Sequence, residues 1–384
     1  MTLVDSKTAR AADRSRIVTI DAEVQELETR LHLLHVERDE FQKRLDAYKY
    51  PVLILPNEIV SEIFVHTLPP YPVCPSLTGL SSPIPLTHIC RKWREIAVFT
   101  PQLWRAICVI SRGRGIRRKQ TVVRTWLERS GSCPLSIRIE TYMDNHPVLE
   151  EILLRHNRWE HVNVLPSLFK GPMTMLRTLS MDLQDGNILS PAVTPADFPR
   201  LQTVSLTWFR KHVDWLPWAQ LTSLTLEYMD SLTFIPILRD AIHLIDLAFI
   251  ECDLLPSWNA ESPADIPLTQ LTSLVMLTSD VQILEVISAP ALQRLRISAE
   301  DLGDKPVGTL GPLISRSGFK LQKLLITGDR RGWPQVSKRV FRSAFPTIPE
   351  IAFNSKFRMN ARQEGDEEDS GDSDEEDADS NSSD

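Results

Sequence analysis

The sequence predicts an α/β solenoid of irregular repeats, preceded by an all-α module and by an N-terminal helix of the coiled-coil type. Three observations lead to this prediction. The pattern Leu-x-x-apolar-x-apolar recurs between residues 176 and 326, apolar residues recur at helical spacing between 50 and 104, and apolar residues alternate three and four apart between 17 and 48. With 384 residues, 42% of them hydrophobic, the chain is long enough for two or three such units.

The first unit is an N-terminal helix with a heptad pattern. Residues 1–16 are polar and are expected to be disordered. Residues 17–49 form the coiled-coil-like helix, in which only Arg38 interrupts the apolar positions. The seam through 17–48 predicts either self-association with a second copy or packing back on the same chain, and the sequence leaves both open. The seam residues are Ile17, Ile20, Val24, Leu27, Leu31, Leu34, Arg38, Phe41, Leu45 and Tyr48.

Residues 50–108 predict two short helices joined by a loop. Pro56 suits a first helical turn, where its missing N–H costs nothing, and an apolar stripe follows it. A second helix is indicated by Leu86, Ile89 and Trp93, and Thr100-Pro101 ends it.

This stretch closely resembles the F-box. The ordered motifs that carry the resemblance are Leu55-Pro56-Asn57-Glu58-Ile59, Ile63-Phe64, Cys90-Arg91-Lys92-Trp93-Arg94 and Pro101-Gln102-Leu103-Trp104. The loop from Leu68 to Pro83 is longer than the usual connection of the family and is similar to inserts in F-box proteins of mushroom-forming fungi.

The resemblance implies a docking role. F-box helices bind the Skp-type linker subunit of cullin–RING ubiquitin ligases, whose other subunits carry out the chemistry. Carried over to this sequence, the linker-binding residues are Leu55, Pro56, Ile59, Ile63, Leu86, Ile89, Trp93, Leu103 and Trp104.

Residues 109–360 predict the solenoid. Copies of the pattern start at 176, 201, 221, 244, 271, 292 and 321, and the region resembles leucine-rich repeats, with irregular first copies. The Asn or Cys that this family places after each strand occurs only once, as Cys252, so an irregular curvature is expected.

Side chains between the buried strand positions should face the concave side. In the early copies they are polar, as in Ser205 and Thr225. In the later copies they are mostly apolar, which predicts a substrate-binding patch. An insert from Pro256 to Pro267 that folds over this patch is the alternative. The predicted patch consists of Ile250, Val275, Leu277, Arg296 and Leu325.

Residues 361–384 form an acidic tail that is expected to be disordered. From Glu364 to Asp384 there are 12 acidic residues and no basic ones, whereas the whole chain has 43 basic and 50 acidic residues. Removing 12 from 50 leaves 38 acidic residues, so the rest of the chain carries a net charge of +5 instead of the overall −7.

No catalytic, metal-binding or cofactor-binding motif is found, so a non-enzymatic protein without cofactors is expected. The five cysteines form no CxxC pair and predict reduced thiols. The basic run at 112–119 lacks interleaved aromatic residues, so no nucleic-acid binding is predicted. No secretion signal and no membrane span are apparent, which favours the cytoplasm, the nucleus or both.

These features together predict the substrate-recognition subunit of a cullin–RING ubiquitin ligase, in which the repeat region holds an unknown protein substrate. Two alternatives remain open. One is an F-box scaffold that acts outside any ligase, and the other is an acidic protein that binds histones or other basic proteins.

Overall fold

The computed structural model describes most of the chain. The described residues are 3–47, 54–110, 116–140, 147–169, 171–183, 193–255, 266–278, 283–298, 310, 321–327 and 342–354. The predicted acidic tail at 361–384 and most of the Pro-rich insert lie outside them. In the described part of the chain, no helix is both long enough and apolar enough to cross a membrane.

The chain divides into two units, residues 1–62 and 63–384, with the boundary inside helix α2 (Asn57–His66). The first unit is dominated by the 45-residue helix α1 (Leu3–Ala47). This helix begins at Leu3, so residues 3–16 are helical and not disordered as predicted. Ala11, Ala12 and several Arg residues in this segment are strong helix formers that extend the heptad helix toward the N-terminus.

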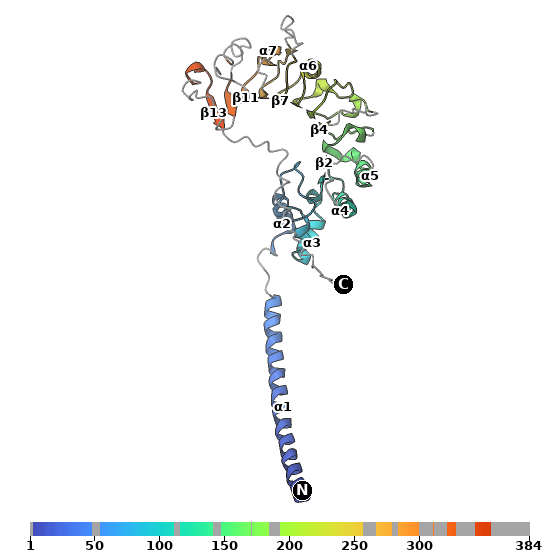
Figure 1. Ribbon diagram of the computed structural model, residues 1–384, viewed down its shortest axis with the longest axis vertical. Helices are drawn as coiled ribbons and strands as arrows, with labels where there is room; N and C mark the ends of the chain where they lie inside the picture. The colour runs from blue at the N-terminus through green and yellow to red at the C-terminus, as the bar shows by residue number, and fades with distance from the viewer. Residues whose placement is uncertain are drawn as a thin grey trace, which may run out of the picture. The chain divides into compact units, whose positions relative to one another are not determined.

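The second unit starts with short helices and continues as a large sheet (Figure 1). The helical segments are η2 (Ile84–Thr87), α3 (Arg91–Val98), η3 (Pro101–Trp104), α4 (Ile116–Arg129), α5 (Pro147–Leu153), η4 (His156–Arg158), η5 (Pro166–Leu168), η6 (Pro195–Asp197), η7 (Trp218–Gln220), α6 (Ser231–Asp240) and α7 (Ile283–Val286). The strands are β1 (Ala106–Ile110), β2 (Leu135–Glu140), β3 (Trp159–Asn163), β4 (Thr178–Asp182), β5 (Thr203–Thr207), β6 (Ser223–Glu227), β7 (Asp246–Ile250), β8 (Ile266–Pro267), β9 (Ser273–Leu277), β10 (Ile287–Ser288), β11 (Arg294–Ser298), β12 (Lys323–Thr327) and β13 (Glu350–Asn354).

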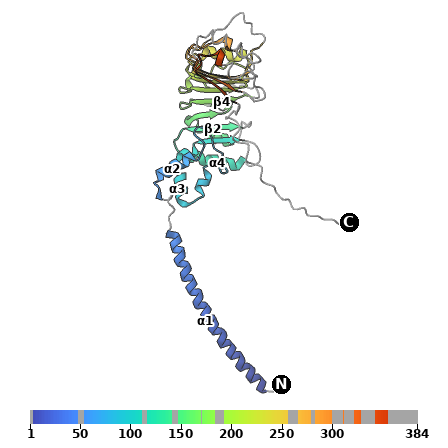
Figure 2. The same ribbon diagram turned by 90° about the vertical axis from the view of Figure 1, so that its left-hand side faces the viewer.

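Eleven strands form one parallel sheet in the order β1-β2-β3-β4-β5-β6-β7-β9-β11-β12-β13, while β8 and β10 pair separately. The strands lie side by side in chain order, as the quarter-turned view shows (Figure 2). The first strand, β1, already starts at Ala106, so the sheet begins inside the segment 50–108 that was assigned to the all-α module.

One face of the sheet is the core. The apolar positions of the repeated pattern point into it, and each of these side chains is exposed by 2% or less. Side chains in a strand alternate between the two faces, so the residues between them line the opposite face. The core set is Leu179, Met181, Val204, Leu206, Leu224, Leu226, Leu247, Phe249, Leu274, Met276, Leu295, Ile297, Leu324 and Ile326.

The predicted solenoid of leucine-rich repeats is wrong. The structure instead has a long N-terminal helix followed by an α/β domain built on one 11-stranded parallel sheet. The pattern Leu-x-x-apolar-x-apolar reports a strand with one buried face, and any such parallel strand satisfies it. It does not specify the connections, which in the described part of the chain include the 14-residue helix α4, the ten-residue helix α6 and the three-residue turn η7.

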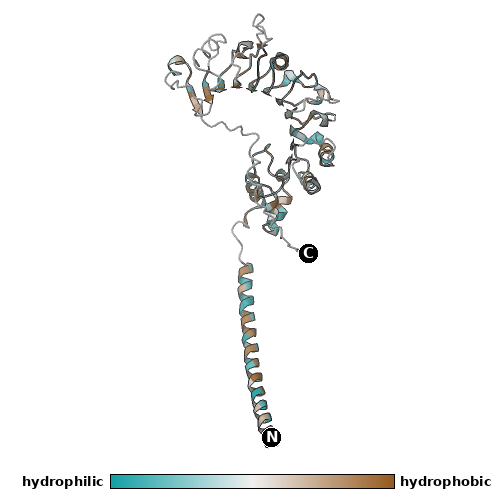
Figure 3. Ribbon diagram, viewed as in Figure 1, coloured by the Kyte–Doolittle hydropathy of each residue, from teal (hydrophilic) through white to brown (hydrophobic). Residues whose placement is uncertain are grey.

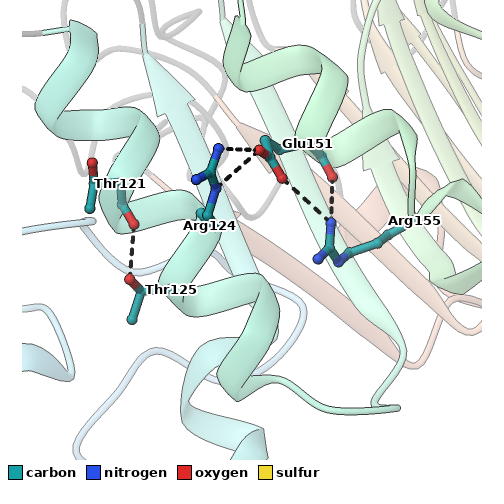
Figure 4. Close-up of polar contacts among 5 residues, drawn as sticks. All are labelled: Thr121, Arg124, Thr125, Glu151 and Arg155. Carbon is teal, nitrogen blue, oxygen red and sulfur yellow. Dashed lines mark hydrogen bonds and ion pairs between the residues drawn. The ribbon is translucent and has the colours of Figure 1, made fainter.

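An ion pair fixes α4 against α5 beside the first strands (Figure 4). Arg124 Nη2 lies 2.5 Å from Glu151 Oε1, and Arg155 Nη1 donates to the main-chain carbonyl of Glu151 at 3.0 Å. Because Arg124 is half-exposed, this pair contributes to orientation more than to stability.

Candidate protein-binding surfaces

The first candidate surface is the segment from Leu55 to Trp104, which we call the docking module. Helix α2 follows Pro56, whose carbonyl accepts the Val60 N–H at 3.1 Å, and Glu58 lies in its first turn. Helix α3 begins after Cys90, whose Sγ accepts the Trp93 N–H at 3.5 Å.

The docking module has its own apolar core. Phe64 is buried, and its ring meets that of Trp93 edge-on at a centroid distance of 4.9 Å. In η3, the buried Trp104 donates from Nε1 to the carbonyl of Ala97, near the end of α3, at 2.8 Å. The Trp104 ring also contacts Trp126 of α4 at 5.5 Å, so the exit of the module is anchored to the domain that carries the sheet.

The predicted linker-binding residues separate into three groups by exposure. Ile59, Ile63 and Ile89 are 50%, 45% and 59% exposed, and Pro56 is also exposed. Leu55, Leu86 and Trp93 are half-buried.

Leu103 and Trp104 are 1% and 0% exposed, so their assignment to a partner surface is wrong. They lie in η3 between α3 and β1, where chain geometry turns their side chains into the core. Their occurrence in a family motif could not distinguish an internal role from a contact role.

Sequence reasoning missed three exposed apolar residues of this segment. Phe99, which follows α3, is 82% exposed, Leu80 is 89% exposed and Val73 is 50% exposed. Phe99 falls outside the helical stripe of the second helix, which is the signal that could have marked it as outward-facing.

The long loop after α2 is held against the sheet. Tyr71 donates its hydroxyl to Glu160 Oε2 at 3.0 Å, and the Arg105 guanidinium lies 3.8 Å from the centre of the Tyr71 ring. Ser136 donates its hydroxyl to the carbonyl of Pro72 at 2.6 Å. Burial, followed by the hydrogen bond to Glu160, raises the pKa of Tyr71, which keeps its hydroxyl protonated as the donor.

The second candidate surface is the predicted patch on the sheet. Register brings its members together, since Ile250 of β7 is opposite Leu277 of β9. In the neighbouring row Arg296 of β11 lies between Val275 and Leu325. All five side chains are half-buried, so they lie on the face opposite the core.

Polar residues border the patch on two sides. The row of paired residues that contains Val275 continues toward β4 through Ala248 to Thr225, Ser205 and Ser180, each opposite the next. On the other side, Arg294 pairs with Asp246 at 3.5 Å and Lys323 pairs with Glu350 at 2.6 Å. A polar border around an apolar centre is the usual composition of a protein-binding surface.

An aromatic pair at the strand ends was not predicted. Trp208 and Tyr228 follow β5 and β6 and stack with a centroid distance of 4.4 Å and an interplanar angle of 7°. Their φ angles are 61° and 54°, in the left-handed region that bulky residues seldom adopt. Each N–H continues the ladder by donating to the next strand, for example from Trp208 to the Glu227 carbonyl at 3.0 Å. Their equivalent positions, one residue after successive strands, were a readable signal.

Two of the described thiols are held in their protonated form by burial. Burial raises the pKa of Cys74 and that of Cys252 to about 11, so both are protonated at neutral pH. Among the residues that the structure describes, no three His, Cys, Asp or Glu side chains gather in a way that could hold a metal ion.

No known protein-family model matches the chain, and no curated protein matches it either. The F-box resemblance therefore depends on the residues quoted above, and the docking role stays a prediction.

Proposed function

We propose that this chain is the substrate-recognition subunit of a cullin–RING ubiquitin ligase. Its docking module binds the Skp-type linker subunit, and the patch on the sheet holds a protein substrate. The observation that best supports this is the division of α2 into two faces. Val60 and Phe64 are each 1% exposed, whereas Ile59 and Ile63, one residue before each of them, are about half exposed.

Ile59 and Ile63 lie at i and i+4, so their apolar side chains are neighbours on one face of the helix. Exposed apolar residues of this kind mark a surface that a partner covers. The second interface is supported by the row of Ile250 and Leu277, which places apolar side chains on the solvent-facing side of the sheet.

The activity of such a subunit is positional. It carries no reacting group of its own, and it raises the effective concentration of substrate near the subunit that transfers ubiquitin. Two surfaces in one chain are sufficient for this role.

Co-purification with purified linker subunit and cullin tests the proposal. The full chain should bring down both, and Ile59→Asp with Ile63→Asp should remove both, because charge would enter an apolar contact. Leu154→Asp is the matched control, since Leu154 is 76% exposed and lies just after α5. Loss of both proteins in the control as well would mean that aspartate substitution damages the fold.

Each remaining outcome separates one function from another. Binding of the linker subunit without cullin would favour the scaffold outside a ligase. Unchanged linker binding by the double variant would contradict the docking role of α2. Binding of core histones that is lost on removal of residues 364–384 would favour the basic-protein-binding alternative.

A further inference from the structure

Helix α1 presents an apolar seam along its surface. Every residue from 9 to 47 is exposed, including the eight apolar seam residues between Ile17 and Leu45, which are 42% to 69% exposed. Hydrophobic and hydrophilic residues alternate along this helix (Figure 3). Packing of the seam back on the same chain is the alternative, and it predicts a monomer in the first experiment below.

The heptad register assigns each seam residue. Ile17, Val24, Leu31, Arg38 and Leu45 occupy a positions, and Ile20, Leu27, Leu34 and Phe41 occupy d positions. The β-branched Ile17 and Val24 at a, with leucine at two of the four d positions, favour two parallel strands. A single polar residue at a, here Arg38, is a feature that fixes register and oligomeric state.

We propose that α1 pairs with α1 of a second copy of this chain as a parallel two-stranded coiled coil. The seam from Ile17 to Leu45 is about 42 Å long at ~1.5 Å per residue. If each of its eight apolar side chains loses roughly 100 Å² of exposed surface, each helix buries about 800 Å². That is the area that a standard stable interface buries on each partner.

Charges beside the seam fit this arrangement. In a parallel pair a g residue meets the e residue five positions later on the other helix, which places Arg16 opposite Asp21 of the second copy. Arg38, which bonds Asp39 through Nη2 at 2.9 Å, also comes next to Glu37 of the second copy. An arginine inside the seam is therefore accompanied by a carboxylate across it.

Within helix α1 (Leu3–Ala47), one pair opposes the arrangement and makes the orientation testable. By the same register, Arg44 at g would meet Lys49 at e, which lies beyond the helix. Glu23 at g meets Glu28 at e of the second copy, and this like-charged contact occurs twice in the dimer. In an antiparallel pair, e residues face e residues, and Glu23 does not meet Glu28. Changing Glu28 to lysine therefore affects the two orientations differently.

The first experiment measures the mass of the full chain in solution by sedimentation equilibrium. The wild type should be a dimer, and Leu27→Asp with Leu31→Asp should weaken dimerisation by about 100-fold or more, because charge would enter the seam. The matched control is Leu33→Asp with Val36→Asp. These residues are equally exposed in the same helix but lie off the seam, so this variant should stay dimeric.

A monomeric wild type would overturn the proposal, and so would equal weakening by the two double variants. Helix content from circular dichroism separates loss of pairing from loss of the helix itself. Neither result bears on linker-subunit binding, which depends on different residues.

The second experiment tests the orientation. Glu28→Lys should tighten the dimer by roughly fivefold, since two repulsive contacts become attractive. Glu28→Gln should give a smaller gain in dimer affinity. A dimer that is unchanged or weakened by Glu28→Lys would exclude the parallel arrangement.

Discussion

Trp104 joins helix α3 of the docking module to helix α4 through three contacts of one side chain. Its indole N–H bonds Ala97, its ring meets Trp126, and the Arg129 guanidinium lies 4.5 Å from the ring centre. Trp104→Ala should lower the free energy of unfolding by about 3–5 kcal/mol, because it leaves a cavity and an unpaired carbonyl. Urea denaturation measures this. Phe99→Ala, at an exposed position nearby in sequence, should change the value by less than about 0.5 kcal/mol, and equal effects would contradict the internal role.

Cys252 makes the free energy of unfolding depend on pH in the alkaline range. Burial raises its pKa to about 11 from an ordinary value near 9, and its Sγ lies 3.3 Å from the Leu226 carbonyl. The folded state keeps this proton while the unfolded state loses it, so stability is complete below pH 9 and falls as pH rises toward 11. The wild-type advantage over Cys252→Ala should therefore shrink by on the order of 2 kcal/mol across this window. A constant difference in thermal or urea unfolding would contradict it.

Single residues show where sequence reasoning succeeds and where it stops. Leu224 and Leu226 were predictable as core because alternation directly reports the buried face of a strand. Leu103 and Trp104 were assigned to a partner surface but are buried, since a sequence motif gives the identity of a residue and not the direction in which its side chain points. Trp208 and Tyr228 were missed although their equivalent positions after two strands were readable, because an aromatic residue, unlike glycine, does not signal the left-handed turn that it occupies.

Among the elements, strands β7 and β9 carry the sharpest test of the patch. Ile250→Glu with Leu277→Glu should leave the domain folded but remove the proteins captured from cell extract by the wild type, because charge replaces the apolar centre. The matched control is Ser205→Glu with Thr225→Glu, which adds the same charges in register on β5 and β6. If circular dichroism shows that the patch variant unfolds while the control stays folded, this face of the sheet is packed against other residues of the same chain.

The elements also explain the error in fold class. The strands at the seven copies of Leu-x-x-apolar-x-apolar were located correctly because this is a local pattern, whereas β1, which lies in the segment assigned to the all-α module, was not predicted. The connections have no common pattern: β6 leads into a ten-residue helix, whereas β5 is followed by the three-residue turn η7 before β6. Stacking of repeats requires equivalent connections, and the sequence had already indicated their absence in the lack of an Asn or Cys after most strands.

For the whole molecule, the acidic tail decides the sign of the net charge but not, we expect, the stability. Deleting residues 364–384 changes the net charge from −7 to +5 and removes no apolar anchor. The free energy of unfolding should stay within about 0.5 kcal/mol of the full-length value. A fall of several degrees in melting temperature at moderate salt would mean that the tail binds the basic remainder of the chain.

The order of the sheet has a consequence for how the protein is made. Each strand of the large sheet pairs with strands that are its nearest neighbours in chain order, with only short β8 and β10 set aside. A strand that leaves the ribosome therefore finds its partner already synthesised, and no later strand has to enter between two earlier ones. Chains fold from the N-terminus during synthesis, so this sheet can grow at one edge as translation proceeds. A nascent chain stopped after β7 would already hold a seven-stranded sheet with a single unfinished edge waiting for β9.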